Sequence, residues 1–277
     1  MVGILLPALG AARVSAQKLK SNTQLRGMHQ ALVTHAQGNK GWYTGYDSGM
    51  NKWMWPALGH KFINDPSGSF PGAISSGVVA GNLPEVRFAE MLVHNLVSPE
   101  YLIHPSEPDF KEPWSSASGK DFKLTNYSYA LNELGVYYYD TFGFSGQNKY
   151  EETWKEWQES MNAQAPVVSD RLYRITGGEP NHPYKQYYVD MYTGKEGDIS
   201  VGVAFNDGHV SRNNSPVFEN TRIGDITNTY DNIFSRGHDM QEGNVQTGPI
   251  LDPAVGSSVH MVHWARSSYV NVDGSNE

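Results

Sequence analysis

The residues whose types could do chemistry in this 277-residue chain are its ten histidines and the Asp207-Gly208-His209 stretch. The histidines are scattered, and His29 and His35, six residues apart, do not share one helical face. A metal site built from distant residues stays open, although surface or capping roles are the favoured interpretation. Asp207 could hold a cation, but a hairpin turn at Asp207 and Gly208 is favoured. We therefore expect neither a metal nor a cofactor.

Linear catalytic signatures are absent from the sequence. It contains no zinc-protease, phosphate-loop, dinucleotide-binding or serine-hydrolase motif. It also contains no cysteine, which excludes disulfides, thiolate nucleophiles and cysteine-ligated metal centres. Many active sites have no linear signature, so this evidence is weak. We predict that the protein is not an enzyme and has no catalytic residues.

Composition and charge narrow the class of protein further. The net charge is −8, and no cluster of Lys and Arg is present, which argues against a nucleic-acid partner. Charged residues make up only 18% of the chain and aromatics 12%, too apolar for a disordered chain. No apolar run reaches the roughly 18 residues of a membrane span. The longest one, residues 2–9, is an oddly apolar start for a chain of this kind.

Residues 3–37 are predicted to form one long helix of roughly 50 Å. Apolar residues recur every three or four positions, as on one helical face: Leu5, Leu9, Ala12, Ala16 and Leu19. The stripe then shifts phase, which argues against a coiled-coil arm, and continues at Leu25, Met28 and Leu32. Pro7 is expected to kink this helix.

The rest of the chain is predicted to form mainly strands. We expect short helices at 85–95 and 150–161, an irregular aromatic segment at 41–84, and strands at 126–131, 166–170, 201–205, 209–212 and 259–264. The Asp207-Gly208 pair favours a type I′ hairpin turn. The predicted fold class is therefore α+β, with a long N-terminal helix packed on an antiparallel β-sheet head. The predicted division is a helix at 1–40 and a head at 41–277.

The chain is rich in Trp and Tyr, with seven and sixteen residues, and most of these must pack internally. Flat aromatic rings stack on sugar faces, so a ligand surface at Trp42, Trp53 and Trp55 would suit a glycan. Packing in the core or at subunit interfaces is the favoured interpretation, and a glycan-binding surface is the alternative.

Several segments together resemble a known family. The start GILLPALGAAR is similar to the end of the apolar half of a type IV prepilin helix, and KLKSNTQLRGM is similar to the amphipathic half in planctomycete-type pseudopilin-like proteins. The stretches LIHPSE, NYSYALN and VGVAFNDGHV resemble that family's "CPSD" segment, its "SYxxN" strand and its C-terminal DGHV hairpin. The resemblance covers the first 40 residues and three short islands. Ser21 and His104 stand where the family usually has cysteine.

The resemblance implies a pilin-like fold and a filament role. It implies a longer apolar helix of which residues 2–9 would be the last turns, placed in the inner membrane before assembly. The residues implied to pack helices together are Leu5, Leu6, Pro7, Leu9, Ala12, Ala16 and Leu19.

We therefore expect a structural subunit of a type IV pilus-like or type II secretion filament at the cell surface. Its partners would be further copies of itself and other pilin-like subunits. The alternative is a cell-surface, adhesin-type module that binds a glycan through its Trp- and Tyr-rich loops.

Overall fold

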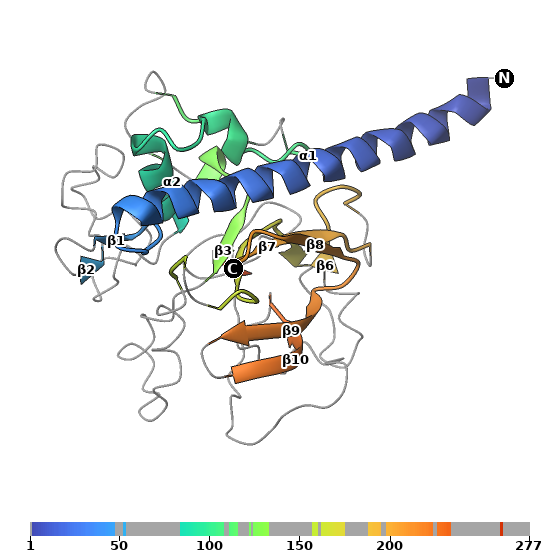
Figure 1. Ribbon diagram of the computed structural model, residues 1–277. Coiled ribbons are helices and arrows are strands. Elements are labelled where there is room, and N and C mark those ends of the chain that lie inside the picture. Colours follow the sequence, from blue (N-terminus) through green and yellow to red (C-terminus); the bar gives the residue numbers. More distant parts are fainter. Residues whose placement is uncertain are drawn as a thin grey trace.

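The computed structural model describes part of the chain, and all structural statements concern that part. The described residues are 2–47, 52–53, 84–107, 111–115, 122, 124–132, 157–159, 162–174, 188–194, 198–223, 226–233 and 261–262. Only the backbone is described for residues 2–7 and for several strand residues. Within these residues the protein has an α+β architecture, in which a long helix lies across an antiparallel sheet (Figure 1).

Helix α1 (Val2–Gly38) comprises 37 residues and is about 55 Å long. It continues through Pro7 without a break, although proline has no N–H to donate to the carbonyl four residues earlier, so one intrahelical hydrogen bond is lost there. The helix ends where Lys40 and Gly41 take positive φ values of 53° and 86°, and the Gly41 amide donates to the Ala36 carbonyl at 2.8 Å. The long helix predicted for residues 3–37 is confirmed.

The main sheet has five antiparallel strands in the order β11-β3-β4-β7-β8. They are β3 (Ala130–Asn132), β4 (Pro166–Ser169), β7 (Val201–Phe205), β8 (Val210–Asn213) and β11 (Met261–Val262). Three smaller antiparallel pairs accompany it: β1 (Tyr46–Asp47) with β2 (Lys52–Trp53), β5 (Tyr173–Arg174) with β6 (Tyr188–Val189), and β9 (Val217–Ile223) with β10 (Ile226–Asn232). Strand β7 lies between β4 and β8 and is buried along its whole length.

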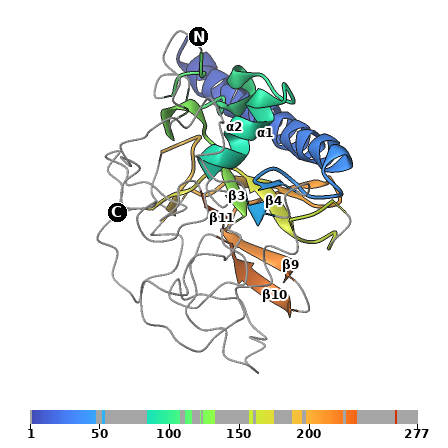
Figure 2. The same ribbon diagram turned by 90° about the vertical axis from the view of Figure 1, so that its left-hand side faces the viewer.

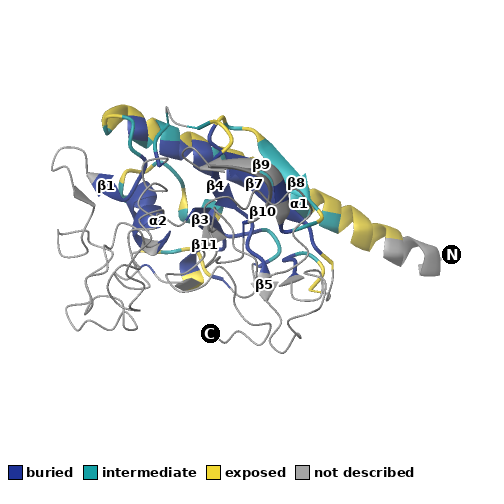
Figure 3. Cartoon of the chain, turned by 90° about the horizontal axis from the view of Figure 1, so that it is seen from below, coloured by how far each residue is buried: buried dark blue, intermediate teal, exposed yellow. Residues whose placement is uncertain are grey.

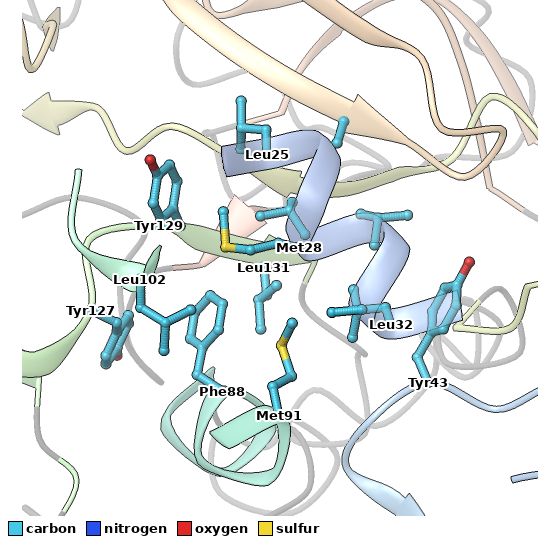
Figure 4. Close-up of a cluster of buried hydrophobic side chains, with 14 of the residues drawn as sticks. Leu25, Met28, Leu32, Tyr43, Phe88, Met91, Leu102, Tyr127, Tyr129 and Leu131 are labelled. Carbon is cyan, nitrogen blue, oxygen red and sulfur yellow. The ribbon is translucent and has the colours of Figure 1, made fainter. Parts of the chain in front are cut away.

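Helix α1 and the shorter α2 (Pro84–Val93) cover one face of this sheet (Figure 2). The core between them is apolar and aromatic, and Leu25, Met28 and Leu32 of α1 are fully buried in it (Figure 4). The alternate residues of β7, Val201, Val203 and Phe205, belong to a second buried cluster with Phe218. The sheet is therefore covered on both faces at β7.

The sequence-based expectations hold for most described elements. The helix predicted at 85–95 and the strands predicted at 166–170, 201–205 and 209–212 correspond to α2, β4, β7 and β8, while β3 and β11 are shorter than predicted. The helix predicted for 150–161 is wrong at its described residues, where Gln158 forms a bridge with Trp42. The buried Trp157 ring instead packs edge-on against the Tyr43 ring, with the ring centroids 5.2 Å apart. The sequence did not predict the β9–β10 pair.

The phase shift in the apolar stripe of α1 marks the boundary of its contact with the sheet. Leu9 and Leu19, before the shift, are each 69% exposed, whereas Leu25, Met28 and Leu32 are fully buried. A straight helix can pack only one of its faces on a sheet. Where the apolar face of the helix changes direction, the apolar residues before the change therefore cannot contact the sheet that buries those after it. Helix α1 thus has a docked half and a projecting half (Figure 3).

Substitution of α1 leucines on the two sides of this boundary should have unequal effects. Leu32→Ala removes buried methyl groups from the core and should lower the free energy of unfolding by about 2–5 kcal/mol. Leu19→Ala, the same chemical change at an exposed position, should stay within about 0.5 kcal/mol of the parent. Urea unfolding of both variants measures the difference. Equal losses of unfolding free energy in the two variants would mean that Leu19 is buried in the isolated chain.

Candidate functional site

The projecting half of α1 carries most of the residues expected to pack helices together. Leu9, Ala12, Ala16 and Leu19 are all exposed there. Leu5, Leu6 and Pro7 are helical, but their side chains lie outside the described residues. From Ala8 to Ala12 every residue is apolar or glycine, and every one is exposed. The structure thus brings the described members of the predicted set together on one uncovered length of helix.

The last turn of the projecting half already touches the head, because the Gln17 side-chain amide donates to the Pro105 carbonyl at 3.2 Å; the docked half begins at Ser21. One turn further on, Ser21 and Gln24 are polar residues that are almost fully buried. Buried polar groups are costly unless they form hydrogen bonds, so their partners show what fixes the helix.

A buried carboxylate is the main partner of Ser21. The Ser21 hydroxyl donates to Asp170 Oδ1 at 2.5 Å, and Asp170 directly follows β4. Its other oxygen, Oδ2, accepts from the Tyr192 hydroxyl at 3.0 Å and from the Gly202 amide at 2.9 Å. The Asp170 amide in turn donates to the Gly202 carbonyl at 2.8 Å, so Asp170 is fixed to β7 through both its backbone and its side chain.

Two cationic or potentially cationic side chains complete this cluster. Arg212 of β8 places Nη1 3.0 Å from Asp170 Oδ2, and its Nη2 donates to Asn22 Oδ1 of α1 at 2.6 Å. His104 Nε2 lies 3.6 Å from Asp170 Oδ1 and 3.2 Å from the Tyr192 hydroxyl. Below, the anchor cluster means Ser21, His104, Asp170, Tyr192 and Arg212. Its members come from α1, a loop, the end of β4, the turn after β6, and β8.

The neighbours of Asp170 in the anchor cluster stabilise its negative charge. Burial alone would raise the pKa of Asp170, but hydrogen bonding and charge from His104, the charge of Arg212 and the Ser21 hydrogen bond outweigh it and hold this pKa well below its ordinary value. Burial and the nearby Asp170 charge raise the pKa of the Tyr192 hydroxyl. Asp170 is thus a permanent anion and Tyr192 a permanent donor across the working pH range.

A second polar bridge lies beside the first. The Gln24 amide nitrogen donates to the carbonyls of Tyr101 and Ile103, both at 3.0 Å. Its carbonyl oxygen accepts from the buried Tyr129 hydroxyl at 2.9 Å. Gln24 therefore connects α1 to the short 3₁₀ helix η3 (Pro99–Leu102) and to the residue before β3. Together, the two bridges fix both the rotation and the axial position of α1 on the sheet.

Gly202 of β7 permits this close approach. A Cβ at this position would lie 2.8 Å from Leu25 Cδ1 and 2.7 Å from Arg212 Nη2, both too short for real contacts. A side chain here would force the Leu25 and Arg212 side chains to shift. Glycine at 202 therefore suits the close packing of α1 on β7.

Ser21, His104 and Asp170 are the residue types of a nucleophilic triad, but their arrangement is different. The Ser21 hydroxyl donates to the carboxylate, and all three residues are fully buried. A nucleophilic serine needs its hydroxyl bonded to the base and open to substrate. This geometry supports a structural role for the cluster.

Ser21 and His104 are also the two positions where the family resemblance leads one to expect cysteine. The structure brings both side chains to the same carboxylate oxygen, Asp170 Oδ1, at 2.5 Å and 3.6 Å. In this chain, hydrogen bonds and charge therefore connect the two segments.

The predicted hairpin turn lies at the end of β7, in contact with α1. Its loop is Asn206-Asp207-Gly208, in which the Gly208 amide donates to the Phe205 carbonyl at 2.9 Å. Of these three residues only Gly208 has a positive φ, of 85°, so the predicted type I′ turn is wrong. A three-residue loop with glycine in the left-handed conformation takes its place.

Contacts at this hairpin loop are extensive. The His29 ring of α1 bonds through Nε2 to the Asn206 carbonyl at 3.1 Å, and burial lowers the pKa of His29. The Tyr43 hydroxyl donates to the Asn206 side-chain oxygen. Asp207 Oδ1 accepts from both the amide and the ring of His209, at 3.0 Å and 2.5 Å. The Asp207 carboxylate is therefore engaged within its own turn.

The three tryptophans of the predicted ligand surface are not brought together by the described residues. Trp42 is half-buried and packs on Tyr46, with ring centroids 4.3 Å apart. Trp53 lies in β2 without a described side chain, and Trp55 lies outside the described residues. The described contacts of Trp42 are those of a packed residue.

The anchor cluster was not predicted from the sequence. Its members lie up to 191 positions apart and match no spacing rule. A signal did exist at Ser21 and Gln24, because polar residues at these positions interrupt the apolar face of an amphipathic helix.

Substitution of Asp170 tests the anchor cluster. Asp170→Asn removes the charge that Arg212 faces and should lower the free energy of unfolding by about 3–5 kcal/mol at neutral pH. The folded-state pKa is depressed, so wild-type stability should be fully present above about pH 4 and should fall as the pH drops toward the folded pKa. The Asn variant should lose less stability over that acid range.

The matched control is Asp198→Asn, at an exposed aspartate. Urea unfolding between about pH 7 and pH 2 measures the free energy of unfolding of the wild type, of Asp170→Asn and of Asp198→Asn. Parallel stability curves for wild type and Asp170→Asn would show that the Asp170 charge is not coupled to folding.

Comparison of the chain with protein families, with curated proteins and with solved structures found no match. Within the described residues, no helix combines the length and apolarity required to cross a membrane.

Proposed function

We propose that the protein is a structural subunit of a type IV pilus-like filament, in which copies pack through the projecting half of α1. The observation that carries this proposal is a difference in polarity between the exposed residues of the two halves of α1. In the docked half the exposed residues are polar except for the terminal glycine: Thr23, Arg26, Gln30, Thr34, Gln37 and Gly38. In the projecting half seven exposed residues are apolar or small, namely Ala8, Leu9, Gly10, Ala11, Ala12, Ala16 and Leu19, and three are polar or charged, namely Arg13, Ser15 and Lys20.

This contrast matters because both halves belong to the same chain and meet the same solvent. An exposed apolar stripe on a soluble helix usually marks a surface that a partner covers. Small side chains at Gly10, Ala11 and Ala12 would let a neighbouring helix approach closely. The resemblance of the first 40 residues to a prepilin helix supports another copy of the same helix as that partner.

Assembly rather than catalysis is the mechanism of this proposal. A projecting helix that packs against the helices of other copies makes a heterologous contact, and such contacts build open helical polymers when they do not close into a ring. The anchor cluster keeps the helix from turning on its own head, so each added copy presents its head in a fixed orientation. Further copies and related subunits are the partners, and the cell surface is the location.

Charges placed on the projecting half should prevent assembly. Leu9→Asp and Ala12→Asp each bury an unpaired carboxylate in the helix bundle, at a cost of several kcal/mol. Electron microscopy of cells carrying each variant in place of the native protein should show no filaments. Gln30→Asp, on the exposed polar face of the docked half, introduces the same charge and should leave filaments intact. Normal filaments in both the Leu9→Asp and the Ala12→Asp variants would overturn the proposal.

Cysteine cross-linking distinguishes a filament from a closed dimer. Because the chain has no cysteine, a Leu9→Cys/Leu19→Cys variant carries only the two introduced thiols. A flexible thiol cross-linker should give a ladder of multimers on intact cells, since each copy contacts two neighbours. Gln30→Cys/Gln37→Cys should give monomers. A product that stops at the dimer would contradict a heterologous interface.

A further inference from the structure

Three side chains with metal-binding atoms meet at the end of the docked half of α1, away from the anchor cluster. His35 lies in the last turn of α1, Glu90 lies in α2, and His94 directly follows α2. One ligand atom from each lies within 4.8 Å of the other two. His35 Nε2 is 3.1 Å from Glu90 Oε1, and His94 Nε2 is 3.9 Å from the same oxygen.

Backbone groups hold two of these side chains in position. His35 Nδ1 lies 3.3 Å from the Trp42 carbonyl, which can only accept, so Nδ1 carries a proton and Nε2 faces Glu90. A metal ion at Nε2 would displace the proton that Nε2 otherwise shares with Glu90. Glu90 Oε2 accepts from the Gly45 amide at 2.5 Å, which leaves Oε1 for the cluster. Hydrogen bonds of this kind orient the histidine and carboxylate ligands of metal ions.

The surroundings favour a cation at this place. Both α1 and α2 have their C-terminal ends here, and helix C-termini carry partial negative charge. The Glu90 side chain is only 5% exposed, so it contributes a nearly fully buried negative charge. His94 keeps its place one turn after Glu90, because the His94 amide donates to the Glu90 carbonyl at 3.0 Å.

The spacing of the three groups is close to that of a tetrahedral ion with one open position. Ligands at the usual zinc distances stand about 3.3 Å apart. The distances of 3.1 Å and 3.9 Å to Glu90 lie on either side of this value, and the His35 and His94 ligand atoms lie within 4.8 Å of each other, so the half-exposed His94 side chain would move inward when the ion binds. A solvent molecule on the exposed side would complete the coordination.

We propose that His35, Glu90 and His94 bind one divalent transition-metal ion, zinc above all, with solvent as fourth ligand. Two imidazoles and one carboxylate form a ligand set typical of zinc. The bound ion would connect α1 directly to α2 and stiffen the docked end of the helix. The site is independent of the projecting half, so its failure and the failure of the filament proposal are distinguishable.

Calorimetric titration of the full chain with Zn²⁺, after treatment with a chelator, tests the site. We expect one ion per chain, and His94→Ala should weaken the affinity by about tenfold or more. His209→Ala is the matched control, since His209 is exposed to the same degree and also pairs with a carboxylate; it should leave the affinity unchanged. Absence of binding, or equal binding by His94→Ala, would overturn the proposal.

X-ray absorption spectroscopy of the zinc-loaded wild-type protein identifies the metal ligands without any amino-acid substitution. It should show four light-atom ligands, of which two are imidazoles. A shell of oxygen ligands alone would mean adventitious surface binding and would also overturn the proposal. Zn²⁺ should raise the thermal unfolding temperature of the wild type and of His209→Ala, but not that of His94→Ala.

Discussion

Asp170 carries a negative charge inside the protein, and the arrangement of the helix on the sheet depends on neutralising it. A buried carboxylate is tolerated only where donors and opposite charge surround it. These donors come from α1, β7, β8 and the turn after β6, so none of these elements can slide without removing one partner of the carboxylate. Apolar packing of Leu25, Met28 and Leu32 supplies much of the stability, and the polar contacts decide the register.

Because α1 is fixed in position on the sheet, the apolar residues of its projecting half stay exposed. An apolar helix on a flexible joint could fold back and cover itself, whereas a helix held at its docked half keeps Leu9 and Leu19 in solvent. The docked half is fixed at its far end too, where His35 bonds to Glu90 of α2. The contacts that hold α1 against the head are thus also those that keep the exposed stripe available to a partner.

Elements with strong local patterns could be predicted from the sequence, and contacts between distant residues could not. The period of α1 and the alternation of β7 are visible because each follows from local geometry. The turn type at Asp207-Gly208 was wrong because Asn206 also belongs to the loop, where its backbone and side chain contact other segments. The anchor cluster and the His35–Glu90–His94 site join segments far apart in the chain, and a single sequence does not show which distant residues meet, even where polar residues such as Ser21 interrupt an apolar face. The apolar residues on α1 were visible, but which of them the sheet covers depended on a register set by Asp170.

The position of α1 at the start of the chain has a consequence for synthesis. Ser21 meets Asp170, His29 meets Asn206 and Asn22 meets Arg212, separations of 149, 177 and 190 positions. The ribosome therefore releases the whole helix long before β7 and β8 exist to receive it. During synthesis of most of the chain, the apolar side chains of α1 therefore contact only water or α2; these are Leu25, Met28 and Leu32. Contacts of such high sequence separation form slowly and leave apolar surface exposed in the meantime. The face that later holds the helix on the sheet is therefore a risk of aggregation in the nascent chain.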